Sequence, residues 1–239
     1  MLKFERLFMQ NIYIKIISLL VLSIILNACR NNSEELKLKG DEYFPLQLGN
    51  VKYYQLDTLK FDNFTGKTDT SSFEYKEEIT NKLIDLQGDT FYRIELSRYN
   101  TIKLKYEIFN VIQRKIVGNY AIENIDNTPQ VKMLFPISNY KTKGSSYGWN
   151  LNMFNALDEE KIKYSAVFKP FFNGVNTYND CVNMALVKPE MGGIVNNIYE
   201  EVYAKNIGLV YRHIDRSDYL TIINNVPIKS GFEITVRLK

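Results

Sequence analysis

The sequence has few of the side chains that carry most metal and redox chemistry, with one histidine and two cysteines among 239 residues. A single histidine, His213, excludes a zinc site built from several imidazoles. The cysteines, Cys29 and Cys181, allow at most one disulfide bond. The sequence also lacks the Asp-x-Asp-x-Asp-Gly pattern of a calcium-binding loop. We therefore expect no metal and no other cofactor.

An excess of positive charge is lacking too. The net charge of +3 includes +2 from residues 1–28, so the other 211 residues carry about +1. In that larger part, Lys and Arg are interleaved with Asp and Glu. A basic face that could hold a phosphate backbone is therefore not expected, and nucleic acid is excluded as a partner.

The apolar run at residues 16–26 is too short to cross a membrane. As a helix it would cover about 16 Å, roughly half of the ~30 Å hydrocarbon core. Basic residues precede the run, and the small residue Ala28 and then Cys29 follow it. This three-part order is typical of a secretory signal peptide.

Leu26-Asn27-Ala28-Cys29 resembles the lipobox of bacterial lipoproteins, with Asn27 where a small or aliphatic residue is commoner. The resemblance implies that the Cys29 thiol receives a diacylglyceryl group, that cleavage follows Ala28, and that acyl chains such as palmitate anchor the protein to a membrane. An ordinary cleaved signal peptide is the alternative. The predicted parts are a signal peptide (1–28), a lipidated tether (29–41) and a folded domain (42–239).

Lipidation of Cys29 would leave Cys181 without a disulfide partner. Cys181 opens the strand-like run 181–187. We therefore expect it to be a small buried residue rather than a reactive thiol.

The folded domain is dominated by apolar residues that alternate with polar ones, and its many aromatic side chains suit a pleated surface. The clearest alternating runs are 102–108 and 234–238. In the first run, Ile102, Leu104, Tyr106 and Ile108 would share a half-buried face. Further strands are predicted at 51–62, 72–85, 90–99, 113–122, 161–169, 178–187, 198–205 and 209–216.

Turn residues separate most of these runs, and residues 155–163 are typical of a short helix, although 161–163 could instead begin the next strand. We predict a mainly β protein with a single antiparallel β domain of about ten strands and one or two short helices. A sheet of that size has to curve into a barrel or half-barrel, or fold over as a sandwich, to bury its apolar face. The sequence leaves these architectures open.

Three segments carry a resemblance to a family. They are the opening 42–50 with its Tyr-Phe-Pro-Leu, the centre with Phe-Pro at 135–136 and Gly-Trp at 148–149, and the closing hairpin 201–210. All three resemble a group of outer-membrane lipoproteins of Bacteroidota. The resemblance implies a shared β architecture and an outer-membrane address, and it brings no activity with it.

The tether contains a possible export signal. Ser33-Glu34-Glu35 is similar to the short serine-plus-acid motif that sends many lipoproteins of this group to the cell surface. An acidic pair is also common in solvated linkers. The cell surface and the periplasmic face of the outer membrane therefore both remain open.

The single tryptophan, Trp149, is predicted to anchor the core, with a platform in a binding groove as the alternative. Tyr53 and Tyr54 are adjacent in a predicted strand, so they should face opposite sides of the sheet. Gly49 and Gly208 suit backbone positions with positive φ.

Patterns for catalysis are weak. Ser146 in Gly-Ser-Ser-Tyr-Gly matches the nucleophile-elbow string, and the order Ser146, Asp180, His213 fits a hydrolase triad. The elbow needs a buried parallel strand before it and a helix after it, and this β-rich context indicates neither. We therefore expect a Gly/Ser loop, no catalytic residue, and a His213 that is exposed or hydrogen-bonded within a strand.

Adjacent carboxylates occur at 77–78, 159–160 and 200–201. Neighbours in a strand point to opposite faces. This arrangement suits a solvated surface better than a glycosidase, whose two carboxylates face each other.

Three classes of function follow from these observations. The favoured class is a non-enzymatic lipoprotein, anchored in the outer membrane through lipid on Cys29, whose β domain binds a protein, a glycan or another envelope component. The first alternative is a carrier or sensor of an apolar ligand held in a curved sheet. The second is a serine hydrolase that uses Ser146 and His213.

Overall fold

The computed structural model describes residues 40–239 except 87, 138–148, 153–160, 187–189, 192–193 and 224–225. The chain divides into two units, Met1–Lys37 and Leu38–Lys239, and the described residues belong to the second. The predicted signal peptide, Cys29, Ser146 and most of the predicted helix at 155–163 lie outside the described residues.

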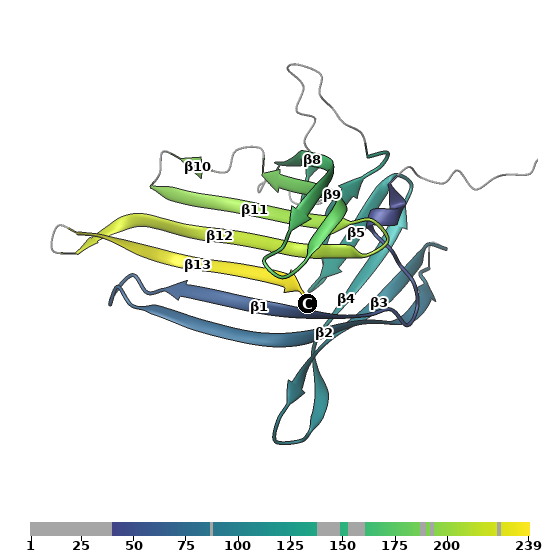
Figure 1. Ribbon diagram of the computed structural model, residues 1–239, viewed down its shortest axis with the longest axis horizontal. Helices are drawn as coiled ribbons and strands as arrows, with labels where there is room; N and C mark the ends of the chain where they lie inside the picture. The colour runs from purple at the N-terminus through teal and green to yellow at the C-terminus, as the bar shows by residue number, and fades with distance from the viewer. Residues whose placement is uncertain are drawn as a thin grey trace, which may run out of the picture. The chain divides into compact units, whose positions relative to one another are not determined.

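About 75% of the described residues belong to antiparallel strands (Figure 1), which confirms the prediction of a mainly β domain. The helical part of the described residues is one 3₁₀ turn, η1 (Asp41–Tyr43). The strands are β1 (Val51–Phe61), β2 (Thr68–Ile84), β3 (Thr90–Asn100), β4 (Lys105–Val117), β5 (Tyr120–Ile125), β6 (Thr128–Leu134), β7 (Trp149–Asn150), β8 (Lys161–Phe172), β9 (Thr177–Leu186), β10 (Glu190–Met191), β11 (Val195–Ala204), β12 (Gly208–Ile223) and β13 (Val226–Leu238).

Strands that follow one another in the chain are almost always neighbours in the sheet. From edge to edge the order is β6-β5-β4-β3-β2-β1-β13-β12-β11-β9-β8-β7, and β10 pairs with β11. The first and last strands pair along their length, from Tyr54 opposite Leu238 to Phe61 opposite Gly231. The result is a meander that curls into a nearly closed, barrel-like sheet.

The two edge strands, β6 and β7, meet along a short seam. The Val131 N–H donates to the Leu151 carbonyl at 2.8 Å, next to an isolated bridge between Gln130 and Asn152. The indole N–H of Trp149 donates to the Val131 carbonyl at 2.8 Å. The sequence did not distinguish a barrel, a half-barrel and a sandwich. The structure is nearly closed, because the contacts at this seam satisfy backbone groups of the edge strands that would otherwise face solvent.

Alternation places side chains as predicted in the first strand. Tyr54 is fully buried and Tyr53 is exposed, so the two tyrosines do face opposite sides of the sheet. The predicted glycine positions are also confirmed, since Gly49 has φ 79° and Gly208 has φ 89°. In the closing strand Val236 is buried, as its alternation predicts.

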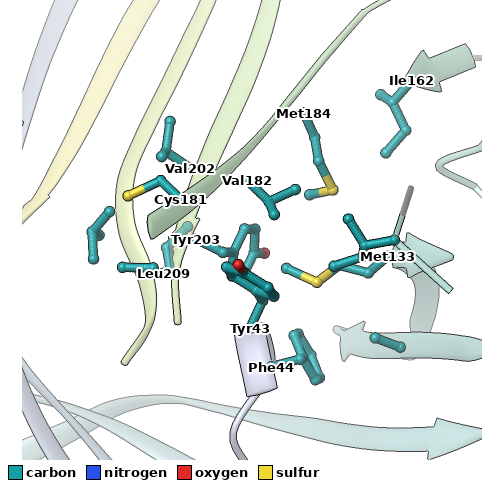
Figure 2. Close-up of a cluster of buried hydrophobic side chains, with 14 of the residues drawn as sticks. Tyr43, Phe44, Met133, Ile162, Cys181, Val182, Met184, Val202, Tyr203 and Leu209 are labelled. Atoms are coloured by element: carbon teal, nitrogen blue, oxygen red, sulfur yellow. The ribbon is translucent and has the colours of Figure 1, made fainter. Parts of the chain in front are cut away.

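The main core lies inside the curved sheet, and the segment at η1 contributes to it. Figure 2 shows Tyr43 and Phe44 at η1 pointing toward side chains of the surrounding strands, among them Val182, Tyr203 and Met133. Tyr43 also donates a hydrogen bond to Asp180 Oδ1 at 2.5 Å. The segment before β1 is therefore part of the fold from Gly40 onward.

Two predicted strands are correct only in part, because each runs through a hairpin turn: residues 105–108 and 113–117 lie in β4 and residues 120–122 lie in β5. Residues 101–104 form the turn between β3 and β4, so Ile102 and Leu104 are exposed rather than half-buried. Tyr106 and Ile108, in β4 next to this turn, are exposed as well, so the predicted half-buried face is wrong for all four residues. The predicted strand 113–122 contains the turn between β4 and β5, where Gly118 has φ 56° and lets the chain reverse. Alternation did not reveal either reversal, because apolar residues continue through both turns. Residues 161–163 begin β8, so the strand alternative holds for them.

Candidate functional site

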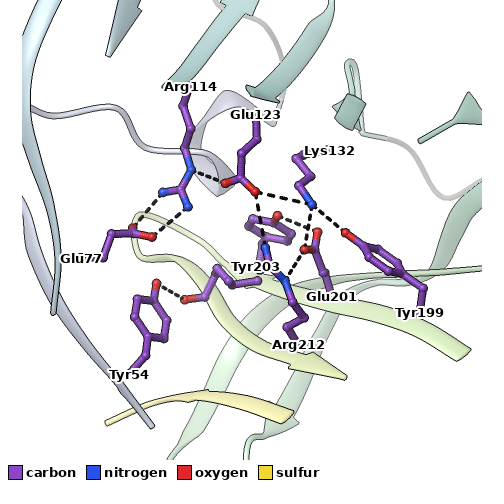
Figure 3. A network of polar contacts seen from close by, with 10 residues as sticks. Tyr54, Glu77, Arg114, Glu123, Lys132, Tyr199, Glu201, Tyr203 and Arg212 are labelled. Atoms are coloured by element: carbon purple, nitrogen blue, oxygen red, sulfur yellow. Dashed lines mark hydrogen bonds and ion pairs between the residues drawn. The ribbon is translucent and has the colours of Figure 1, made fainter. Parts of the chain in front are cut away.

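Six charged side chains meet inside the curved sheet, and we call them the charge network (Figure 3). Each comes from a different strand, and five of them are buried, whereas Arg212 is partly exposed. Three are acids and three are bases, so their formal charges cancel. The members are Glu77 of β2, Arg114 of β4, Glu123 of β5, Lys132 of β6, Glu201 of β11 and Arg212 of β12.

Arg114 organises the first half of the network. Its Nη1 and Nη2 atoms each donate to one carboxylate oxygen of Glu77 at 2.8 Å. Its Nε donates to Glu123 Oε2 at 2.6 Å. Such two-pronged contacts use the planar geometry of the guanidinium and fix the position of both carboxylates.

Glu201 organises the second half. Its Oε1 accepts from Arg212 Nε at 2.6 Å and from Lys132 Nζ at 3.1 Å. Its Oε2 accepts from the Tyr203 hydroxyl at 2.8 Å. Lys132 Nζ also donates to the Tyr199 hydroxyl at 2.7 Å. Both oxygens of this fully buried carboxylate are therefore satisfied.

Glu123 links the two halves electrostatically. Its Oε1 lies 3.6 Å from Lys132 Nζ and 3.5 Å from Arg212 Nη2, and no hydrogen bond within the described residues reaches it. One carboxylate thus faces three cations from three other strands. The network joins the wall formed by β2 to β6 with the wall formed by β11 and β12.

The three acids stay ionised in spite of their burial. Desolvation by itself would raise the pKa of Glu77, but the charge and hydrogen bonds of Arg114 outweigh it, so the pKa is lowered. Burial by itself would also raise the pKa of Glu201, but the charges of Arg212 and Lys132 outweigh burial, so this pKa is lowered too. The pKa of Glu123 is lowered in the same way by Arg114, Lys132 and Arg212.

This arrangement suits structure better than proton transfer. A general acid at neutral pH needs a carboxyl with a raised pKa, whereas all three pKa values here are lowered. Each charge is also paired with opposite charges inside the sheet. The network therefore ties distant strands together.

Lys52 lies next to the network on the buried face of β1. It stands opposite Glu77 in the β1–β2 register. Burial lowers its pKa to about 8, although Glu77 acts in the other direction. A Cβ atom at Gly208 would lie 3.0 Å from Lys52 Nζ, so the backbone of Gly208 closes over this amine. Sequence reasoning did not single out Lys52.

The structure does not bring the described members of the predicted triad together. Asp180 lies on β9 and accepts from Tyr43, whereas His213 lies on β12 and its Nδ1 is 3.3 Å from Thr235 Oγ1. The strand between them pairs His213 with Glu200 and Glu200 with Ala185. Asp180 is five residues from that position, about 16 Å along the strand. The hydrogen-bonded strand position predicted for His213 is confirmed.

Of the two cysteines, the structure describes Cys181. It is buried, as predicted, and carries no disulfide. Burial raises the pKa of its thiol to about 11, with a smaller contribution from Asp180. The thiol is therefore protonated at neutral pH and a poor nucleophile. The predicted lipidation site, Cys29, lies outside the described residues, as does Ser146.

Trp149 is buried at 9% exposure, as predicted for a core anchor. Its ring centroid lies 4.9 Å from that of Tyr164. The hydroxyl of Tyr164 in turn donates to the Leu134 carbonyl at 2.8 Å and accepts from the Leu134 N–H at 3.1 Å. The tryptophan therefore packs against the seam between β6 and β7 rather than forming an open platform.

The prediction of a solvated surface for the adjacent carboxylates is wrong for Glu77 and Glu201. The two pairs that the structure describes do point to opposite faces, but Glu77 and Glu201 point inward and are buried. The signal was present in the sequence, because Glu77 alternates in phase with the apolar residues Tyr75 and Ile79. The pair at 159–160 lies outside the described residues.

Shallow hollows and several exposed apolar tips lie on the described surface. One hollow, of about 520 Å³, lies beside Tyr53, Glu74 and Lys239, and another, of about 550 Å³, lies beside Phe61 and Phe232. The apolar tips lie at hairpin turns. The most exposed residues among them are Leu86 between β2 and β3, Ile102 and Leu104 between β3 and β4, Phe64 between β1 and β2, and Leu220 and Ile222 near the end of β12.

Two searches of the described residues found no site of a specific kind. No cluster of three or more His, Cys, Asp or Glu side chains in this part of the chain could hold a metal ion. No helix in the same residues has the length and apolarity needed to span a membrane.

Comparison with known proteins adds little about function. No protein-family model matches this chain, and no curated protein matches it. Among solved structures, a crystal structure of a candidate exported protein with a YmcC-like fold from Bacteroides fragilis matches with a TM-score of 0.35 and 10% sequence identity. The match covers 82% of this chain and 97% of that chain. At this TM-score, the likeness supports no transfer of function.

Proposed function

We propose that this chain is a lipid-anchored, non-catalytic protein of the cell envelope whose β domain is a rigid body that binds its partner at the surface. The observation that carries the proposal is the charge network. Glu77, Glu123 and Glu201 are neutralised by cations from other strands, so these groups need no ligand to compensate their charge. Binding is therefore assigned to the outside of the sheet.

The anchor in this proposal is lipid on Cys29. It rests on the lipobox resemblance of residues 26–29 and on the signal-like residues before them. Two or more acyl chains are enough for stable attachment to a bilayer. The address is the outer membrane, on the cell surface or the periplasmic face.

The two alternatives fit the geometry less well. An apolar ligand at the level of Arg114 and Glu201 would have to break ion pairs and leave charges without partners, which is costly in a buried environment. A serine hydrolase would need Asp180 beside His213, and these residues are separated by about 16 Å along the strand direction.

Metabolic labelling with an acyl-chain analogue tests the anchor. Wild-type protein should be labelled and found in the membrane fraction. The Cys29→Ser variant should lose the label and retain its signal peptide, because serine has no thiol for the diacylglyceryl group. Cys181→Ser is the matched control and should remain labelled. Labelling that survives in Cys29→Ser would overturn the lipoprotein assignment.

Two further measurements separate the remaining possibilities. Native mass spectrometry of the purified chain should show the mass of protein and acyl anchor alone, whereas an additional apolar molecule at a one-to-one ratio would favour the carrier. Protease treatment of intact cells tests the side of the membrane. Degradation in wild type that is lost in Glu34→Ala/Glu35→Ala would support surface display, and resistance until the cells are broken would support the periplasmic face.

A further inference from the structure

We propose that the tip of the β3–β4 hairpin, residues 98–106, docks onto an anionic lipid surface. This inference rests on the proposed anchor only for the presence of a bilayer nearby. The hairpin projects from the sheet (Figure 1), and at its turn Ile102 is 92% exposed and Leu104 is 74% exposed. These apolar side chains form a convex point, which suits insertion between lipid headgroups.

Leu104 has a backbone conformation in which leucine does not favour folding. Leu104 has φ 51°, a left-handed conformation that leucine rarely adopts and that glycine adopts readily. A strained position on the surface is usually filled by glycine or asparagine. Because Leu104 is largely exposed, burial within this chain does not account for the leucine.

The backbone N–H groups of the turn are hydrogen-bonded within the chain, which lowers the cost of transferring the turn out of water. Asn100 Oδ1 accepts from the N–H groups of Ile102 at 2.9 Å and Lys103 at 3.0 Å. The side-chain amide of Asn100 donates to Glu107 Oε2 at 2.7 Å. Backbone donors that are satisfied within the chain lower the cost of moving a turn into an apolar layer. They also fix the backbone of the turn that carries Ile102.

Charge complementarity points to anionic lipid. Residues 98–106 contain three basic side chains, Arg98, Lys103 and Lys105, and no acidic one. Glu107 follows directly and pairs with Lys103 at 2.8 Å, so the local charge remains positive. The β12–β13 tip differs, because Leu220 and Ile222 are also exposed but residues 218–226 contain an aspartate and no basic residue.

Tyrosine side chains lie just behind the apolar tip of the hairpin, where lipid headgroups would contact them if the tip entered a bilayer. Tyr99 and Tyr106 face each other across the hairpin with ring centroids 5.3 Å apart, and Tyr53 lies 6.3 Å from Tyr106. Tyr99 is three residues from Ile102, and because residues 101–104 form a turn the two Cα atoms are at most about 10 Å apart. Interfacial elements commonly enter a bilayer by about 5–10 Å, with tyrosine at the boundary. The hairpin matches this layering.

Vesicle partitioning of the lipid-free mature chain, residues 30–239, tests the proposal without any contribution from the acyl anchor. The chain should bind vesicles that contain phosphatidylglycerol, and binding should weaken as salt is raised. Ile102→Ser/Leu104→Gly should lower the partition coefficient about tenfold, because two apolar side chains are lost. Lys103→Gln/Lys105→Gln should lower binding to anionic vesicles and leave the weaker binding to phosphatidylcholine vesicles unchanged.

Two controls keep the result interpretable. Leu220→Ser/Ile222→Ser removes an equally apolar pair from the other tip and should bind like wild type. Leu104→Gly alone should unfold at the same or a higher urea concentration than wild type, because glycine relieves the left-handed strain. Failure of wild type to bind anionic vesicles would overturn the proposal, even if the hairpin binds a protein instead. An equal loss of vesicle binding in Ile102→Ser/Leu104→Gly and in Leu220→Ser/Ile222→Ser would overturn it as well.

The vesicle result and the anchor result are independent. Acyl labelling of Cys29 does not depend on the hairpin, and vesicle binding of the lipid-free chain does not depend on Cys29. A labelled protein that does not bind vesicles would therefore refute the hairpin inference alone.

Discussion

Arg114 and Glu77 form a two-pronged ion pair across a strand that lies between them. Nη1 and Nη2 of Arg114 are each 2.8 Å from a carboxylate oxygen of Glu77. The residues come from β4 and β2, and β3 is the strand between these two in the sheet. The pair therefore holds the curvature of three strands, and Glu123 extends it to a fourth.

Loss of the Arg114 guanidinium should destabilise the domain strongly. Arg114→Met leaves Glu77 and Glu123 buried without their main cation, and we expect the free energy of unfolding to fall by about 3–5 kcal/mol. Urea denaturation at pH 7 measures this. Arg93→Met removes a partly exposed partner of Glu95 and should cost below about 1 kcal/mol. Similar losses in both variants would contradict a special role for the network.

Acid should weaken the fold through the buried carboxylates. The pKa values of Glu77, Glu123 and Glu201 are lowered in the folded state from an ordinary value of 4.5. Below about pH 4.5 the unfolded chain thus binds more protons than the folded one, so the free energy of unfolding decreases as pH falls. Urea denaturation from pH 7 to pH 3 measures the slope. Glu77→Gln should have a shallower slope than wild type, and an unchanged slope would assign the acid sensitivity to other groups.

Lys52 should destabilise the fold at neutral pH. Its pKa is lowered to about 8 by burial, so below that pH the folded state holds a charge that is poorly solvated. We expect Lys52→Met to raise the free energy of unfolding at pH 7 by about 1–2 kcal/mol. Between pH 8 and 10.5 the unfolded wild type binds more protons, so wild-type stability rises relative to the variant and the difference shrinks. Lys60→Met, at an exposed site of the same strand, is the control for the loss of a lysine and should change the free energy of unfolding at pH 7 by less than about 0.5 kcal/mol.

Trp149 should report on the seam between β6 and β7. Because it is the single tryptophan, native emission should come from one buried indole and shift to longer wavelength in urea. Trp149→Ala should cost about 3–5 kcal/mol as a large-to-small core change. Trp149→Phe keeps most of the packing but loses the hydrogen bond to the Val131 carbonyl, and should cost about 1–2 kcal/mol. A native emission maximum typical of water would contradict the buried position.

The triad residues should be dispensable for any hydrolytic signal. We expect Ser146→Ala, Asp180→Asn and His213→Ala to leave the rate unchanged in a panel of esterase and peptidase substrates. Asp180 and His213 have other hydrogen-bond partners, Tyr43 and Thr235. A wild-type activity that disappears in both Ser146→Ala and His213→Ala would restore the hydrolase alternative.

The sequence by itself determined the class of fold and the faces of most strands, because a strand places successive side chains on opposite faces whatever it packs against. Tyr53 and Tyr54 could be assigned correctly on that basis, and Cys181 and Trp149 from the tendency of these residue types to be buried. The hairpin turns at 101–104 and at Gly118 were missed, since a period of two does not show where the chain reverses.

Only the tertiary structure decided which charged residues are buried. Glu77 was in phase with buried neighbours, yet a carboxylate is buried only when cations reach it, and Arg114 is 37 residues away in the chain. Glu201 depends in the same way on Lys132, 69 residues away. The curvature of the sheet brings these partners together, and curvature results from the packing of the whole chain rather than from the period of any one strand.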